Sequence, residues 1–152
     1  MSDIKEPAEN SLKDKHLLIA ADKKINREIT VLLKDTGLLI DTAINGREVV
    51  EMTAEAPFKY DLILLDLYMP VIDGFEAARR IRTLEKSLTG STVLRKGRTR
   101  GIPIIAVTDS LYHGEMSKCF SFGIDDCLKK PLDMAKLNKK ICDYLTWPPI
   151  VR

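Results

Sequence analysis

Short apolar runs alternate with amphipathic stretches along most of this chain. Each apolar run predicts a buried strand, because a strand covered on both faces has no polar side to present. The stretches between the runs carry apolar residues three or four positions apart, which predicts helices with one buried face. The expected strands are residues 16–21, 38–44, 63–65, 102–107 and 126–128, and the expected helices are residues 24–36, 47–56, 75–84, 112–122 and a last one after residue 133.

Residues 60–70 contain the predicted central strand and the candidate reactive residue. The apolar run in this stretch, residues 63–65, is flanked by carboxylates and is typical of a strand buried in a parallel sheet. The run ends at Asp66, and the following Met69-Pro70 disfavours regular structure. Because open α/β sheets bind ligands at the carboxyl ends of their strands, we interpret Asp66 as the reactive residue.

The apolar positions of the helices indicate which faces are buried. Gly37, Pro57 and Gly123 are placed to end the first, second and fourth helices, and Asp133 is placed to cap the last one. The positions expected to face inward are Ile25, Ile29, Leu32 and Leu33; Val49, Val50 and Ala54; Met116, Cys119 and Phe120; and Leu137, Ile141 and Leu145.

The alternation of strand and helix runs five times and predicts a doubly wound α/β sandwich with right-handed crossovers. We expect one domain, residues 16–146, with a flexible leader at residues 1–15 and a tail at residues 147–152. Residues 87–101 are rich in glycine and polar residues and include a basic cluster between residues 95 and 100, which predicts a long loop. We interpret this loop as a solvated tether, with docking of a partner or an anion as the alternative.

Composition narrows the possible functions. The chain has 152 residues and a net charge of +2, from 24 basic and 22 acidic residues, so no global charge favours nucleic acid or membrane binding. No window reaches the ~18 consecutive apolar residues of a membrane span, and the first fifteen residues lack the core of a signal peptide. The three cysteines lack metal-ligand spacing and predict reduced packing residues of a cytoplasmic protein, with a redox role as the alternative.

Four residues with phosphoryl or metal chemistry follow the predicted strands. Asp22, Asp66, Thr108 and Lys130 come after the first, third, fourth and fifth strands, so a parallel sheet would gather them at one edge. Two carboxylates suit a hard cation such as Mg²⁺. A lysine can balance a transferred anion, and a threonine hydroxyl can donate to one of its oxygens.

The motifs at these positions resemble a known family. Residues 61–77, DLILLDLYMPVIDGFEA, resemble the phosphoacceptor segment of response regulator receiver domains, especially those attached to hybrid sensor histidine kinases. Residues 104–108 and 125–131, IIAVT and DDCLKKP, resemble the later motifs of that family, and Asp22 with residues 25–27 resembles the first. The resemblance spans the whole predicted domain and implies a flavodoxin-like fold with strand order 2-1-3-4-5.

The resemblance also implies roles for individual residues. Asp66 would accept a phosphoryl group from a phosphohistidine of a histidine kinase or a histidine phosphotransfer domain. Mg²⁺ would be held by Asp22, Asp66 and the backbone carbonyl of Tyr68. Lys130 would pair with the phosphoryl group, Thr108 would move to bond it, and the peptide bond before the proline at position 131 would be cis. The added charge of about −2 would bias a two-state surface formed by the fourth helix, fifth strand and fifth helix, which is also the candidate homodimer face.

Three positions depart from the family pattern. Ala21 stands where a second acid usually precedes Asp22, which predicts weak Mg²⁺ binding, because affinity follows ligand charge. Asp109 follows the threonine where a very small residue is usual, so it would either repel the phosphoryl group or replace the missing acid at the metal. Cys127 occupies the usual aromatic switch position, which predicts absent or altered coupling to Thr108.

These features leave alternatives open. The first is a working receiver whose only catalysis is its own Mg²⁺-dependent phosphorylation and dephosphorylation. The second is a degenerate receiver that acts as a protein interaction module. An aspartyl phosphatase is disfavoured, since such enzymes generally need another acid at the position of Tyr68. We expect a cytoplasmic chain, alone or within a membrane-tethered hybrid kinase, and no nucleic acid partner.

Overall fold

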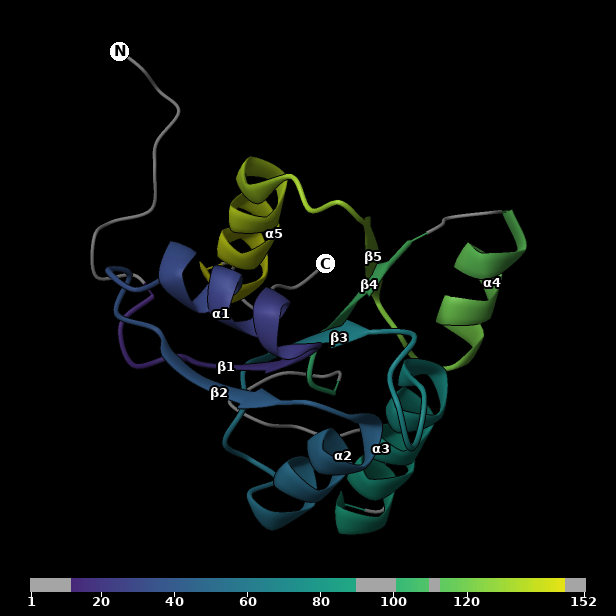
Figure 1. The fold of residues 1–152 in the computed structure, drawn as a ribbon. Coiled ribbons are helices and arrows are strands. Elements are labelled where there is room, and N and C mark those ends of the chain that lie inside the picture. The colour runs from purple at the N-terminus through teal and green to yellow at the C-terminus, as the bar shows by residue number, and fades with distance from the viewer. Residues whose placement is uncertain (1–11, 90–100, 110–112, 147–152) are drawn as a thin grey trace.

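Five parallel strands alternate with five helices in the computed structural model, which describes residues 12–89, 101–109 and 113–146 (Figure 1). The strands form one sheet with the order β2-β1-β3-β4-β5, which confirms the predicted doubly wound fold. The strands are β1 His16–Ala20, β2 Leu39–Ala43, β3 Leu62–Asp66, β4 Ile104–Thr108 and β5 Asp126–Lys129, and the helices are α1 Lys23–Leu32, α2 Gly46–Glu55, α3 Gly74–Thr89, α4 His113–Ser121 and α5 Met134–Thr146.

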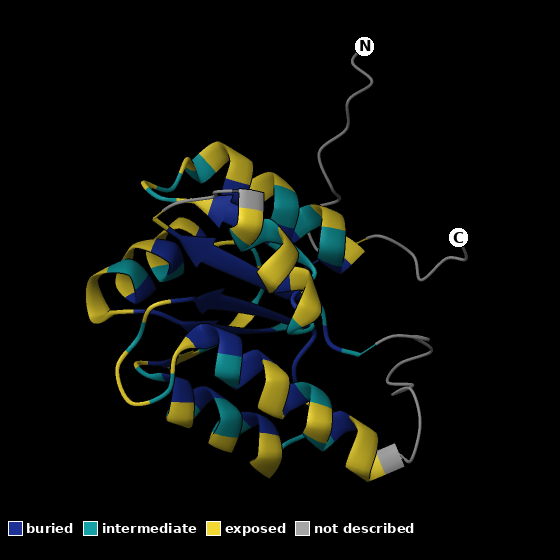
Figure 2. Cartoon of the chain, turned by 90° about the vertical axis from the view of Figure 1, so that its right-hand side faces the viewer, coloured by how far each residue is buried: buried dark blue, intermediate teal, exposed yellow. Residues whose placement is uncertain are grey.

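Helices cover both faces of the sheet. Figure 1 shows α1 and α5 on one face and α2, α3 and α4 on the other. Side chains alternate between these faces along each strand, so Leu17 and Ile19 join the core under α1 and α5, whereas Leu18 and Ala20 join the core under α2, α3 and α4. Every residue of β3 and β4 is buried, and Figure 2 shows dark blue, buried strands between the helices. Burial on both faces explains why these strands are continuous apolar runs.

Side-chain caps begin the helices that lead away from the sheet. Asp133 Oδ1 accepts from the N–H groups of Ala135 and Lys136 at 3.0 and 3.1 Å, which confirms its predicted role at α5. Asn45 caps α2, where its Oδ1 accepts from the Glu48 N–H at 2.8 Å. Asn45, two residues after β2, therefore marks the start of α2.

Three of the expected inward positions are wrong. Leu32 is 38% exposed and Phe120 is 54% exposed. Ala54 is also exposed, and its neighbour Thr53 is buried instead, with its hydroxyl donating to the Val49 carbonyl at 2.8 Å. Adjacent residues of a helix differ by about 100° in direction, so only one of two neighbours can point at the centre of the core.

Two expected segment boundaries are also wrong. Leu12, placed in the leader, is 5% exposed and packs in the core under α1 and α5, because burial of its side chain against that core is favourable. Helix α3 runs through Thr89 rather than ending near residue 84. Glu85, in this added turn, is buried, and its Oε2 accepts from the Ile102 N–H at 2.8 Å. The basic cluster at residues 95–100 and the predicted tail at residues 147–152 lie outside the described residues.

Within the described residues, no helix combines the length and the apolar character needed to cross a bilayer.

Candidate functional site

The strand ends predicted to form a site do meet at one edge of the sheet. Strand β3 pairs with both β1 and β4, and β4 pairs with β5, all in parallel. Asp66 is the last residue of β3, Thr108 is the last residue of β4, and Lys130 follows β5 directly. The backbone N–H of Lys130 donates to the Thr108 carbonyl at 2.7 Å, which connects the ends of β4 and β5.

Asp66 and Lys130 form the central contact of this edge. The ammonium Nζ of Lys130 lies 2.8 Å from Asp66 Oδ2, and Asp66 is 4% exposed. The other carboxylate oxygen, Oδ1, accepts from the Tyr68 backbone N–H at 3.1 Å. The peptide bond between Lys130 and Pro131 is cis, as the resemblance implied. The Asp66 carboxylate is therefore held in one orientation beside a cation.

A cavity of about 320 Å³ opens next to this pair. Both carboxylates proposed for the metal, Asp22 and Asp66, line it together with Lys130. The remaining lining residues are Lys23, Ile44, Tyr68, Met69 and Pro70. The sheet topology thus places an acid pair and an ammonium group around one space that is large enough for a phosphoryl group and ordered water.

Asp22 is also the N-cap of α1. Its Oδ1 accepts from the Ile25 N–H at 2.8 Å, and the buried side-chain amide of Asn26 donates to the carbonyls of Ala21 and Ala43, both at 3.0 Å. These bonds hold the end of β1 against β2 and fix the direction of Asp22. Because a carboxylate has two oxygens, capping leaves the second one available for a cation.

The loop between β3 and α3 returns closely to the sheet edge. The Gly74 N–H donates to the Leu67 carbonyl at 2.8 Å. A Cβ at position 74 would lie 2.5 Å from the Asp66 carbonyl oxygen and 2.7 Å from the Leu67 Cα, so only glycine allows this approach. Gly74 thus allows this loop to pack directly against the backbone of Asp66.

The hydroxyl of Thr108 is not in the cavity. Thr108 is fully buried, and its Oγ1 lies 3.5 Å from Glu115 Oε1 of α4. The structure therefore brings Asp22, Asp66 and Lys130 together around the cavity and places the Thr108 side chain behind them, facing α4.

The ring of Tyr68 has a partner that the sequence did not indicate. Its hydroxyl donates to Glu115 Oε2 at 2.6 Å, and its ring meets Phe75 edge-on with centroids 6.3 Å apart. The hydrogen bond to Glu115, with smaller contributions from burial and nearby negative charge, raises the pKa of the Tyr68 hydroxyl to about 12. Sequence reasoning assigned a role only to the Tyr68 carbonyl and missed Glu115, because an acid in the first turn of a helix is an ordinary surface feature.

The three departures from the family pattern have distinct surroundings. Ala21 is buried, and Asp109 is exposed and does not line the cavity. Across the part of the chain that the structure describes, no three acidic, histidine or cysteine side chains form a metal cluster. The cavity consequently offers a cation two carboxylates rather than three.

Cys127 packs against another cysteine. Its Sγ lies 3.3 Å from Cys119 Sγ in the core, and all three cysteines of the chain are free thiols. Burial raises the pKa of both buried thiols, that of Cys127 to about 12. Cys119 and Cys127 are therefore packing residues of the core, whereas Cys142 is partly exposed.

The fold and the site together define a flavodoxin-like domain whose candidate functional residues lie at the carboxyl ends of the strands. Residues 17–142 match the family model described as the response regulator receiver domain. This chain belongs to the response regulator receiver domain family, which confirms the resemblance in the sequence.

A curated relative, hybrid signal transduction histidine kinase B of Dictyostelium discoideum, is 40% identical over 126 residues. That match covers 82% of this chain and 6% of the kinase, so the chain spans a small part of the relative it resembles.

Solved structures of receiver domains share the fold. One is the complex of the Saccharomyces cerevisiae histidine phosphotransfer signaling protein Ypd1 with the receiver domain of its downstream response regulator Ssk1. It matches with a TM-score of 0.78 and 29% identity over 92% of this chain and 94% of that chain. The receiver domain of a histidine kinase from Arabidopsis thaliana, complexed with Mg²⁺ and BeF₃⁻, matches with a TM-score of 0.68 and 28% identity over 89% and 95% of the two chains.

Proposed function

We propose that Asp66 accepts a phosphoryl group from a phosphohistidine of a histidine kinase or a histidine phosphotransfer domain. The observation that carries this proposal is the 2.8 Å contact between Lys130 Nζ and Asp66 Oδ2 beside the cavity. In the transfer, an Asp66 carboxylate oxygen forms a bond to phosphorus as the bond from phosphorus to the histidine nitrogen breaks. The product is an acyl phosphate, and the histidine recovers its neutral ring after taking up a proton.

The residues around Asp66 suit that transfer. The Tyr68 N–H orients the carboxylate through Oδ1, so the approach of the phosphorus is restricted. The Lys130 ammonium lies where negative charge accumulates on the transferred group and stabilises it electrostatically. Low exposure of Asp66 strengthens this interaction, because water screens it less.

The donor set fits a magnesium ion of modest affinity. Asp22 and Asp66 supply carboxylates on the same cavity, and the Tyr68 backbone carbonyl is the third proposed ligand. Mg²⁺ commonly keeps several waters and needs few protein ligands. When bound, it would neutralise charge on the phosphoryl oxygens. We propose that binding is weak, because Ala21 contributes no carboxylate and the exposed Asp109 does not line the cavity.

The interaction-only alternative depends on Ala21, Asp109 and Cys127. None of these residues disrupts the contact between Lys130 and Asp66, which favours the phosphoryl-accepting function. A homodimer through α4, β5 and α5, and a cytoplasmic location, remain proposals. Exposure of Phe120 on α4 is the observation that supports the dimer.

Uptake of a phosphoryl group tests the proposal. Wild type, incubated with Mg²⁺ and a phosphorylated histidine phosphotransfer domain, should gain the mass of one phosphoryl group. Asp66→Asn should not gain it, whereas Asp143→Asn, the same change on the exposed side of α5, should behave as wild type. Uptake by Asp66→Asn would contradict the assignment of the acceptor. Absence of uptake by wild type at millimolar Mg²⁺ would favour the interaction-only alternative.

A further inference from the structure

Glu115 connects helix α4 to two residues of the candidate site. One carboxylate oxygen, Oε2, accepts from the Tyr68 hydroxyl at 2.6 Å, and the other, Oε1, lies 3.5 Å from Thr108 Oγ1. We propose that Glu115 is a positioning residue that holds Tyr68 and Thr108 in the resting arrangement, and that a phosphoryl group on Asp66 breaks these contacts and releases α4. This inference rests on the proposed function.

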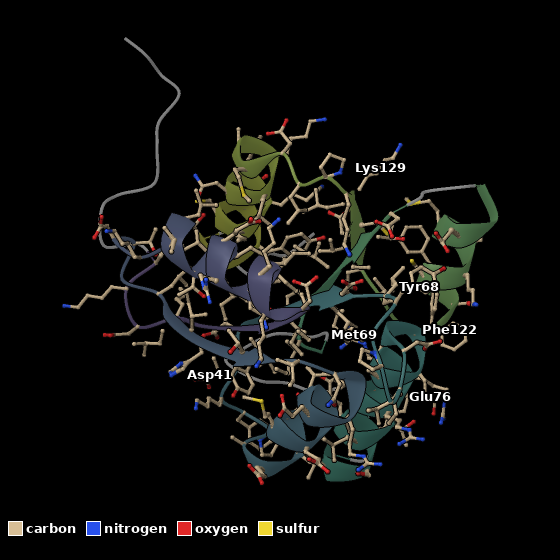
Figure 3. All side chains as sticks on the ribbon, in the orientation of Figure 1. Asp41, Tyr68, Met69, Glu76, Phe122 and Lys129 are labelled. Carbon is tan, nitrogen blue, oxygen red and sulfur yellow. The ribbon has the colours of Figure 1, made fainter. Side chains whose placement is uncertain are left out.

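Tyr68 and Thr108 are both close to Asp66, either along the chain or across the sheet. Tyr68 lines the cavity, and its backbone N–H already bonds Asp66 Oδ1. Thr108 ends β4, the strand beside β3, in which Val107 is the partner of Asp66. Figure 3 labels Tyr68 in the space between the strand edge and α4. A change at Asp66 therefore reaches Glu115 by two short routes.

The two contacts of Glu115 differ in length. The bond from Tyr68 is a short, charge-assisted hydrogen bond to a carboxylate, and Tyr68 itself is 56% exposed. The contact with Thr108 is at the outer limit for a hydrogen bond and holds the hydroxyl weakly. The shorter bond ties Tyr68 to α4 more closely than the longer contact ties Thr108.

Charge supplies the force that moves Glu115. A phosphoryl group adds about −2 charge at Asp66, and this charge repels the carboxylate of Glu115 on α4. Repulsion of Glu115 then displaces the first turn of α4, which carries this residue.

Uptake of beryllofluoride, a phosphoryl mimic, tests the energetic part of the inference. In the presence of Mg²⁺, Glu115→Ala should bind the mimic about 3- to 10-fold more tightly than wild type, because both the restraint and the repulsion are removed. Glu115→Gln, which keeps an acceptor for Tyr68 but loses the charge, should lie between the two. Glu51→Ala, the same truncation at an exposed site of α2, is the matched control and should equal wild type. Thermal unfolding of each variant reports whether it is folded.

The tyrosine itself reports on the contact without any phosphoryl chemistry. The ring carbon that bears the hydroxyl of Tyr68, assigned by its loss in Tyr68→Phe, should shift in the NMR spectrum of Glu115→Ala and stay in place in Glu51→Ala. When wild type binds the mimic, its Tyr68 signal should move to the position seen in Glu115→Ala. A simple loss of negative charge would not produce that coincidence.

The outcomes separate this inference from the proposed function. If all variants bind the mimic equally, or if the Tyr68 signal of wild type does not move on binding, the inference is wrong and the function stands. If Tyr68 senses Glu115 but wild type binds neither the mimic nor a phosphoryl group, the contact exists and both the function and the releasing role are wrong.

Discussion

At the scale of single residues, the candidate site depends on one ammonium group. Lys130 is the cation that the structure places on the Asp66 carboxylate, whereas the neighbouring Lys129 is exposed and is labelled at the outer side of the strand end in Figure 3. Two adjacent lysines thus have different surroundings, and a substitution at each separates the effect of position from the effect of charge.

Lys130→Ala should reduce the rate of phosphoryl uptake by about 10- to 100-fold, because a charge-assisted hydrogen bond of ~1.5–3 kcal/mol to the transferred group is lost. Lys129→Ala removes the same charge from the chain and should change the rate less than about 2-fold. Intact-mass kinetics with a phosphorylated donor measures both. Equal losses in the two variants would show that general charge, not the contact with Asp66, is responsible.

The buried thiols are a second property of single residues. Burial raises the pKa of Cys119 and raises that of Cys127 to about 12, so the reactive thiolate is scarce at neutral pH and increases as the pH approaches that value. Alkylation of both by iodoacetamide near neutral pH should be at least about 10-fold slower in the folded chain than in urea. Peptide mass spectrometry locates the label. Fast labelling of the folded chain at these positions would contradict their burial.

At the scale of elements, the loop between β3 and α3 supports the site through a close backbone approach. Gly74 begins α3, and any side chain there would collide with the backbone of Asp66 and Leu67. Gly114 lies at the start of α4, and, outside its own helix and chain neighbours, none of the described residues has an atom within 4 Å of the position that a Cβ would take. The two glycines therefore have opposite roles, although both lie in the first turn of a helix.

Gly74→Ala should lower the free energy of unfolding by more than about 2 kcal/mol and impair phosphoryl uptake, because the Asp66 backbone must shift. Gly114→Ala should be neutral or stabilise the chain by up to about 1 kcal/mol, since alanine is the better helix former. Urea unfolding followed by circular dichroism measures both. A Gly74 variant that is as stable as wild type would argue against the close approach.

At the scale of the whole molecule, acid stability depends in part on a pair remote from the candidate site. The Tyr60 hydroxyl donates to Asp41 Oδ2 at 2.6 Å and joins the loop before β3 to the edge strand β2. This hydrogen bond is the main reason that the pKa of Asp41 lies below its ordinary value; burial opposes it, and the nearby Lys59 ammonium assists it. The folded state consequently holds this carboxylate ionised to lower pH than the unfolded state does.

The pair should stabilise the fold above the ordinary aspartate pKa of about 3.9 and lose that contribution as the pH falls through the lowered pKa of Asp41. Tyr60→Phe should cost about 1 kcal/mol of unfolding free energy at pH 7 and less at about pH 3. Asp41→Asn has no ionisable group at this position, so its free energy of unfolding should likewise differ from that of wild type more at pH 7 than at about pH 3. Urea titrations at the two pH values measure this. A cost for Tyr60→Phe that grows on acidification would contradict the sign.

Much of the architecture is visible in the order of residues. The apolar runs predicted all five strands, and Asp133 and Gly123 correctly marked the start of α5 and the end of α4. The errors concern faces and ends. Leu32 and Phe120 are apolar yet exposed, because periodicity leaves neighbouring positions ambiguous, and Leu12 is buried although the residues around it show no period.

The sequence alone was enough to predict a parallel α/β fold and the four polar residues at its strand ends. A strand that is buried on both faces appears as a short run of apolar residues, and the residue that follows each run lies at the end of the strand. Only the packed structure showed that the Thr108 hydroxyl faces Glu115 rather than the cavity and that the Tyr68 ring is tied to α4. These contacts join residues 7 and 47 positions apart across different elements. Their geometry depends on how α4 is seated on the sheet, which no repeat of apolar residues specifies.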